Sequence, residues 1–148
     1  LGFGGSTYFW CDIFFHQIIE TVEPSKILLY AGDNDLGTGV PENEILGSVE
    51  RLLEKLKIKF ASIPITIISV KPSPDRRHLE ADMKSLNQKL HELITEYEKG
   101  SFVDIYSSML NKDGALRPEL YIEDELHINE RGYEIWKEVI QKHLVKSM

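Results

Sequence analysis

Two residues suited to acid–base chemistry, Asp124 and His127, lie three positions apart near the end of the chain. In a turn, this spacing allows the aspartate carboxylate to reach one nitrogen of the histidine ring. A carboxylate on one ring nitrogen selects the tautomer and orients the other nitrogen to accept a proton. The pair therefore predicts general acid–base catalysis. From spacing alone, a capping aspartate beside an incidental surface histidine is the more common explanation.

A second polar group, Gly32-Asp33-Asn34-Asp35, directly follows the apolar run at residues 27–31. Such a short run, ended by turn residues, predicts a strand buried on both faces of a parallel sheet. Ligands bind at the carboxyl ends of strands in open α/β sheets, where these polar residues would lie. The Asn34 amide could donate to a developing oxyanion. A simple turn rich in Asp and Asn explains the same residues without any function.

A third group, the glycine-rich opening at residues 2–7, precedes a predicted helix. A backbone N–H from such a segment can bind an anion. The segment lacks the lysine of a phosphate-binding loop, and no dinucleotide-binding glycine pattern occurs, so nucleotide binding is weakly supported. Ser73, Ser107 and Ser108 follow predicted strands and could be nucleophiles, but turn formation explains them better. No Gly-x-Ser-x-Gly motif is present.

Alternating helices and strands must position these groups. Apolar runs predict strands at residues 27–31, 63–70 and 102–106. Apolar residues at helical spacing predict helices around residues 7–22, 45–56, 79–97 and 129–144, with a long loop at residues 107–123. Strands that alternate with helices predict right-handed crossovers and a parallel sheet covered on both faces. The whole chain, residues 1–148, reads as a single domain.

Taken together and in order, the three groups resemble the motif blocks of the SGNH hydrolases, also called GDSL lipases and esterases. The resemblance is carried by Gly-Phe-Gly-Gly-Ser-Thr (residues 2–7), Gly-Asp-Asn-Asp (residues 32–35) and Asp-Glu-Leu-His-Ile-Asn-Glu-Arg-Gly-Tyr (residues 124–133). The Lys-Pro-Ser-Pro segment at residues 71–74 also resembles members of this family. The resemblance extends from residue 1 to about residue 136.

The resemblance implies a three-layer α/β/α, flavodoxin-like fold and hydrolysis of a small ester by a Ser-His-Asp triad. It assigns His127 as general base and then general acid, with Asp124 orienting it. It assigns Gly5 and Asn34 as oxyanion donors. It implies no cofactor and no metal, and its substrate is a small-molecule ester whose acyl group and alcohol stay open. The loop at residues 107–123 is expected to form a pocket wall.

The chain departs from the family pattern in one respect. The family's first block, Gly-Asp-Ser, carries the nucleophile on the first strand, and the chain begins at the second block. We therefore expect the serine and the N-terminal strands to lie upstream of Leu1. The strand at residues 27–31 would then have an open edge, to be covered by the missing segment or by another chain. The 148-residue chain alone is expected to be inactive.

Composition and charge limit the classes of partner, metal site and cellular location that the chain is compatible with. The formal net charge of −7 argues against a nucleic-acid partner, which requires a basic surface. No apolar run approaches the roughly 18 residues of a transmembrane segment. A single cysteine rules out an internal disulfide, and the histidines lack zinc-ligand spacing. The location is unknown from the sequence: no signal peptide is visible, which slightly favours the cytoplasm, but the N-terminal segment is expected to be missing.

Two other functions remain open from the sequence. A relative that kept the oxyanion glycine and asparagine but lost the serine would be a non-catalytic binding or interaction module. A phosphate-binding, response-regulator-like domain shares the same fold class. Its acidic pocket should follow the first strand, and no such pocket is visible in the sequence. Labelling of an upstream-extended chain with an activity probe would separate the first alternative from an esterase.

Overall fold

The computed structural model describes residues 2–146, which fold around one sheet of three parallel strands. The strands are β1 (Ile27–Leu29), β2 (Ile65–Ile68) and β3 (Gly100–Val103), in the spatial order β1-β2-β3. Ile27 pairs with Ile65, and Ile65 pairs with Gly100. The three predicted strands are therefore confirmed, but β1 and β2 are shorter than their apolar runs, and β3 begins two residues before the predicted run and ends at Val103.

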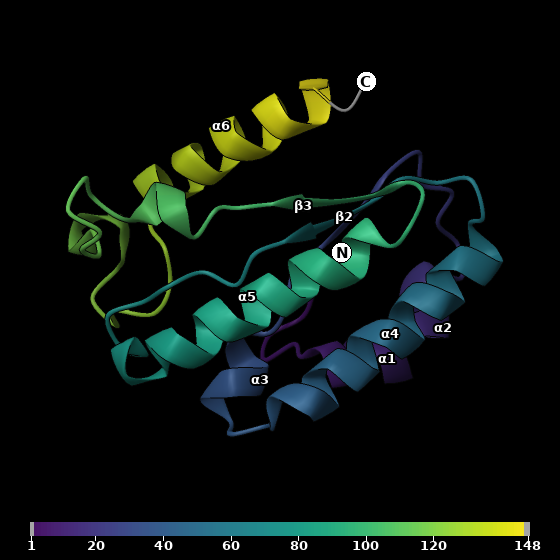
Figure 1. Ribbon diagram of the computed structural model, residues 1–148, viewed down its shortest axis with the longest axis horizontal. Coiled ribbons are helices and arrows are strands. Elements are labelled where there is room, and N and C mark those ends of the chain that lie inside the picture. The colour runs from purple at the N-terminus through teal and green to yellow at the C-terminus, as the bar shows by residue number, and fades with distance from the viewer. Residues whose placement is uncertain (1, 147–148) are drawn as a thin grey trace.

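Helices cover both faces of this sheet (Figure 1). The helices are α1 (Tyr8–Ile13), α2 (Phe15–Ile19), α3 (Asp33–Gly37), α4 (Glu42–Lys59), α5 (Glu80–Thr95) and α6 (Glu130–Lys146), with short 3-10 turns η1 (Arg77–Leu79), η2 (Ser107–Met109) and η3 (Pro118–Leu120). Helix α6 packs on one face, and α1 to α5 lie on the other. The predicted three-layer α/β/α architecture is confirmed. No helix among residues 2–146 is long and apolar enough to cross a membrane.

Each face of the sheet has its own hydrophobic core. The core under α4 and α5 includes Ile65 and Ile67 of β2, whereas Ile68 packs into the core under α6. This division follows from the alternation of side chains along a strand. All four residues of β2 are buried, so both layers are anchored on the central strand.

The prediction that residues 27–31 form a strand buried on both faces is wrong. Strand β1 lies at an edge of the described sheet, and the Leu28 side chain is 40% exposed. The Ile27 N–H donates to Pro64 O of the neighbouring segment at 2.9 Å. Because successive N–H groups of a strand point in opposite directions, the Leu28 N–H faces away from β2. Among residues 2–146, β1 therefore has the open edge that the sequence analysis expects for this chain.

The first predicted helix is divided, and its apolar stripe faces outward. A break at Phe14 separates α1 from α2, and Trp10, Ile13 and Phe14 are 43%, 50% and 39% exposed. The buried Asp12 explains this orientation, because its carboxylate binds Arg51 at 2.9 Å and Lys55 at 2.6 Å on α4. These ion pairs turn the Asp12 side of α1 toward α4, and the aromatic residues are left on the surface.

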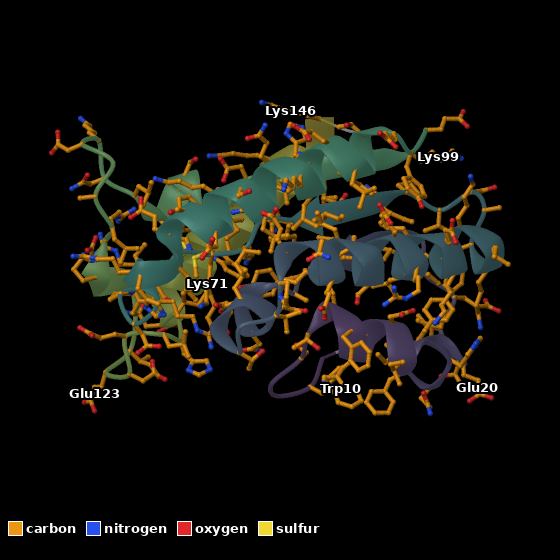
Figure 2. All side chains as sticks on the ribbon, turned by 60° about the horizontal axis from the view of Figure 1, so that its bottom comes forward. Trp10, Glu20, Lys71, Lys99, Glu123 and Lys146 are labelled. Atoms are coloured by element: carbon orange, nitrogen blue, oxygen red, sulfur yellow. The ribbon has the colours of Figure 1, made fainter. Side chains whose placement is uncertain are left out.

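The carboxyl ends of the three strands share one end of the molecule. The segments that follow β2 and β3 gather there, beside the start of α6 (Figure 1). In Figure 2, Lys71 and Glu123 lie toward this end, and Lys99, just before β3, lies toward the opposite end. The polar segments that follow the strands therefore meet at this end, as expected for a parallel sheet.

Candidate active site

The Gly32-Asp33-Asn34-Asp35 group forms the start of a short helix, α3, after β1. Gly32 adopts φ +104°, a backbone conformation that residues other than glycine rarely adopt. A Cβ atom at this position would lie 2.7 Å from Val70 Cγ2. Glycine therefore allows the turn to pack directly against the segment that follows β2.

Asp35 ties the glycine-rich opening to α3. Its buried carboxylate accepts the Tyr8 N–H at 3.1 and 3.2 Å and the Gly32 N–H at 3.1 Å. Burial raises the pKa of Asp35, and the hydrogen bonds from these N–H groups oppose that rise. The sequence placed Asp35 in the polar group without a role. The sequence feature that could have indicated this role is an acidic residue after β1 together with a predicted helix start at residues 7–8, whose free N–H groups need an acceptor.

Asn34 and the glycine-rich opening lie side by side. The Asn34 amide Nδ2 donates to Ser6 O at 3.1 Å, and the preceding residue, Gly5, occupies a turn with φ +68°. On the other side, Asn34 Oδ1 accepts a hydrogen bond from Arg76 Nη2 at 3.3 Å. One N–H of the Asn34 amide remains available to a ligand. Asn34 and Gly5 are thus at the same end of the sheet, as predicted.

Asp33 is the centre of a buried charge cluster that sequence reasoning missed. Its carboxylate accepts from Lys71 Nζ at 2.6 Å and from Arg76 Nη1. Arg76 Nη1 also donates to the Asp33 backbone oxygen at 2.6 Å. Asp33 and Lys71 are both buried. The available signal was a pair of cations following β2 and an aspartate following β1, since neighbouring parallel strands end at the same edge.

Asp124 and His127 form a hydrogen-bonded pair in the turn before α6. The Asp124 Oδ2 lies 2.5 Å from His127 Nδ1. Asp124 Oδ1 accepts the backbone N–H groups of His127 and Leu126, each at 2.9 Å. The bond to the His127 ring, with these backbone bonds, lowers the pKa of Asp124 to about 2.

This pairing orients the histidine ring. An ionised carboxylate can only accept, so His127 Nδ1 donates to it, and in the neutral ring the lone pair is on Nε2. The His127 side chain is 69% exposed, and no described residue hydrogen-bonds to Nε2. The ring therefore presents a basic nitrogen to solvent at the carboxyl end of the sheet.

The segment after β2 contacts both halves of the site. The Asp75 N–H donates to Glu125 O at 3.1 Å, beside Asp124, and Arg76 contacts Asp33 and Asn34. The Tyr121 hydroxyl donates to Pro72 O at 2.6 Å, which attaches the same segment to the loop before Asp124. These contacts connect the Asp124–His127 pair to Asn34 through a few packed residues.

The three serines considered as nucleophiles have other surroundings. Ser107 Oγ binds the Asp104 carboxylate at 2.5 Å, and Ser108 Oγ donates to Ile105 O at 2.6 Å. Ser73 Oγ is buried and has no partner among the described residues. None of these hydroxyl groups hydrogen-bonds to His127. Turn formation therefore accounts for Ser107 and Ser108.

A cavity of about 270 Å³ adjoins the site. Its walls come from the segment after β2, the start of α5 and residues 106–116, so part of the predicted loop does line a pocket. Within residues 2–146, no three His, Cys, Asp or Glu side chains are grouped as metal ligands would be.

Comparisons with known proteins agree on one family. The sequence profile of the GDSL-like lipase/acylhydrolase family matches residues 1–135. A GDSL-like lipase from Bacteroides thetaiotaomicron is 26% identical, with a TM-score of 0.79 over 97% of this chain and 73% of that one. A Bacteroides fragilis protein assigned as an acylhydrolase is 25% identical, with a TM-score of 0.83 over 99% and 74% of the two chains.

A third solved structure shares the fold at slightly lower identity. It is a Streptococcus pneumoniae protein described as a platelet activating factor, 24% identical, with a TM-score of 0.84 over 95% of this chain and 69% of that one. A search of curated protein sequences finds no match.

Proposed function

Because the chain belongs to the GDSL-like lipase/acylhydrolase family, we propose that it supplies the acid–base pair and two oxyanion donors of a serine-dependent ester hydrolase. The observation that carries this proposal is the Asp124–His127 pair, joined at 2.5 Å, with Nε2 of an exposed ring free to take a proton. A histidine held in this way is suited to activate a serine hydroxyl.

The reaction proceeds in two steps, with His127 moving the proton in each. The serine Oγ attacks the ester carbonyl carbon while His127 Nε2 removes the hydroxyl proton. His127 then gives this proton to the departing alcohol, and an acyl-enzyme remains. Water, deprotonated by His127, attacks the acyl carbon, and the carboxylic acid leaves as the serine regains its proton. Asp124 orients the ring and stabilises its protonated form throughout.

Gly5 and Asn34 stabilise the negative charge that develops on the carbonyl oxygen. The Asn34 amide binds Ser6 O with one N–H, so its second N–H can donate to the oxyanion. Ser6 directly follows Gly5, so the Gly5 backbone lies beside this amide. Two such donors, held before the reaction begins, lower the barrier without reorganising in the transition state.

The nucleophilic serine lies outside the 148 residues, on a strand that pairs with the open edge of β1. Two observations support this part of the proposal. No described serine binds His127, and the Leu28 edge has no strand beside it in the described sheet. A groove of about 500 Å³ also runs along β1 and is lined mainly by apolar side chains, among them Ile19, Leu28 and Phe60. An added strand would cover this apolar surface.

The substrate class that best fits is a small carboxylic ester. The relatives are named as a lipase and an acylhydrolase, and the cavity beside Arg76 has a volume of about 270 Å³. This is near the lower end of ligand-pocket volumes, which begin at roughly 300 Å³. A short acyl group or a compact alcohol would fill such a space.

One observation favours a second candidate, a non-catalytic binding module on the same fold. His127 has no serine partner among residues 2–146, which is also what a relative without a nucleophile would show. In that case Asn34 and His127 would bind a carbonyl or carboxylate ligand without turning it over. The two candidates differ in whether any form of the protein reacts with a serine-directed probe.

The deciding experiment measures intact mass and N-terminal sequence of the purified protein, then reacts it with a serine-directed phosphonate. Labelling at one serine upstream of Leu1, in a longer species only, supports the proposal. One probe per molecule at a serine inside the 148 residues would show that the nucleophile has been misplaced. Absence of labelling in every form supports the binding module. In the labelled form, Asn34→Ala should lower kcat by roughly a hundredfold with little change in KM.

A further inference from the structure

Arg76 spans the two residues at the start of α3. Its Nη1 donates to Asp33 O at 2.6 Å and also binds the Asp33 carboxylate. Its Nη2 donates to Asn34 Oδ1 at 3.3 Å. The Arg76 side chain is only 13% exposed, so these bonds form in a largely water-excluded position. Lys71 holds the other oxygen of Asp33 at 2.6 Å, which keeps the acceptor in place.

These contacts determine which way the Asn34 amide points. A guanidinium group can only donate hydrogen bonds, so the atom facing Arg76 must be the amide oxygen. The Ser6 carbonyl can only accept, so the atom facing it must be the amide nitrogen. With the oxygen and one N–H fixed, the remaining N–H has a single direction. The positively charged guanidinium beside Oδ1 also polarises the amide and makes that N–H a stronger donor.

Gly37 provides the space that Arg76 occupies. A Cβ atom at Gly37 would lie 2.6 Å from Arg76 Cζ and 2.8 Å from its Nε. The guanidinium therefore lies flat against the last residue of α3. Residue 37 offers a way to displace the Arg76 head group while its charge is retained.

We propose that Arg76 is a positioning residue for the reaction, which it serves by fixing the Asn34 amide with its free N–H toward the substrate oxygen. The effect of this positioning on catalysis rests on the proposed esterase function. The backbone N–H of the neighbouring residue, Asp75, donates to Glu125 O at 3.1 Å. The same segment therefore also holds the loop that carries Asp124 in place. Arg76 also lines the cavity of about 270 Å³, but its positioning role is exerted through Asn34.

The first test observes the Asn34 amide directly and needs no turnover. In the 148-residue protein labelled with ¹⁵N-asparagine, Asn34→Ala identifies the Asn34 Nδ2–H signals. Arg76→Ala should move these signals toward those of free asparagine and speed their exchange with solvent. Arg77→Ala is the matched control, because the exposed Arg77 side chain has no hydrogen bond or ion pair among the described residues. Unchanged Asn34 signals in folded Arg76→Ala would overturn the proposal.

The second test is a double-mutant cycle in the form of the enzyme that reacts with the phosphonate. Arg76→Ala should lower kcat by roughly tenfold to a hundredfold, with KM nearly unchanged, because a misplaced donor loses transition-state stabilisation. In an Asn34→Ala background, the same change should have almost no further effect on kcat. Additive losses would refute positioning through Asn34.

Two further variants separate geometry from charge. Gly37→Ala should lower kcat in the same direction as Arg76→Ala but less, since the flexible side chain can partly adjust. Relative to Arg76→Ala, Arg76→Lys should restore the ion pair with Asp33 but not the simultaneous hydrogen bonds to Asp33 and Asn34. We therefore expect kcat to recover only in part. If no form of the protein hydrolyses esters while the Asn34 signals still depend on Arg76, the proposed function fails and the positioning of the amide stands.

Discussion

At the scale of single residues, hydrogen bonds hold the pKa of the Asp124 carboxyl below its ordinary value. The carboxylate accepts three hydrogen bonds, from the His127 ring and from the N–H groups of His127 and Leu126. All three favour the ionised form, and the pKa falls from its ordinary value of 3.8 to about 2. Asp124 is exposed, so its hydrogen bonds rather than its burial account for the shift.

The first prediction concerns pH. Because the pKa of Asp124 is lower in the folded state, its contribution to stability is present above pH 3.8 and is lost as pH falls through about 2. The Asp124 carboxyl carbon, followed by NMR, should titrate near 2 and shift toward 3.8 in His127→Ala. Asp124→Asn identifies the signal. A wild-type midpoint at the ordinary value would mean that the hydrogen bonds to His127 do not persist in solution.

The second prediction concerns turnover by the active form of the enzyme. His127→Ala should reduce kcat by about a thousandfold or more, because loss of a triad base removes proton transfer in both steps. Asp124→Asn should reduce kcat by an equal or smaller factor, since the ring loses its orientation but keeps Nε2. His78→Ala provides the control, as His78 lies in η1 and has no part in the mechanism. Near-normal turnover in His127→Ala would remove this residue from the mechanism.

At the scale of elements, short helices rather than long ones position the oxyanion donors. Helix α3 carries Asn34, and α1 begins just after Gly5. The two helices are joined by the Asp35 carboxylate, which accepts the Tyr8 and Gly32 N–H groups. Helices α4 and α5 supply the core beneath them but no predicted site residue. The relative position of the two donors therefore depends on the buried Asp35 side chain together with the Asn34–Ser6 hydrogen bond.

The third prediction tests this link between α1 and α3. Asp35→Asn places an NH₂ group against backbone N–H donors and should lower the free energy of unfolding by about 1–3 kcal/mol. Because burial raises the pKa of Asp35 in the folded state, the native wild-type protein binds a proton more readily than the unfolded chain does, so its stability relative to Asp35→Asn should grow as pH falls through this pKa. Urea unfolding at pH 7 and pH 4 measures both effects. Asp82→Asn, at an exposed position of α5, is the matched control. Equal stability of the two variants would contradict the proposed link.

At the scale of the whole molecule, one side has an apolar surface that a single chain leaves uncovered. Trp10 and Phe14 stack at a centroid distance of 5.4 Å, and Phe3 and Phe9 contact them edge-on. The open edge of β1 and the groove beside it continue this surface. Exposed patches of this kind mark contacts with other protein segments or a tendency to associate.

The fourth prediction is that the 148-residue protein associates in a concentration-dependent manner through this surface. Sedimentation velocity should show larger species as concentration rises, and the double variant Trp10→Ser, Phe14→Ser should reduce them. Tyr133→Ser is a suitable control, because this exposed aromatic residue lies on α6, across the sheet. A wild-type monomer at all concentrations, or an equal effect of Tyr133→Ser, would count against association through the aromatic surface.

The sequence by itself determined the fold class and the order of the elements, because helical and strand periodicities are local properties of the chain. It also located Asp124 and His127, whose contact needs only a turn, and it placed Asn34 after β1. The tertiary structure decided what depends on neighbours distant in sequence. The position of β1 at the edge follows from pairing, and the outward face of α1 follows from the ion pairs of Asp12. The link from Arg76 to Asn34 spans 42 positions and joins the ends of adjacent strands, which no local pattern encodes.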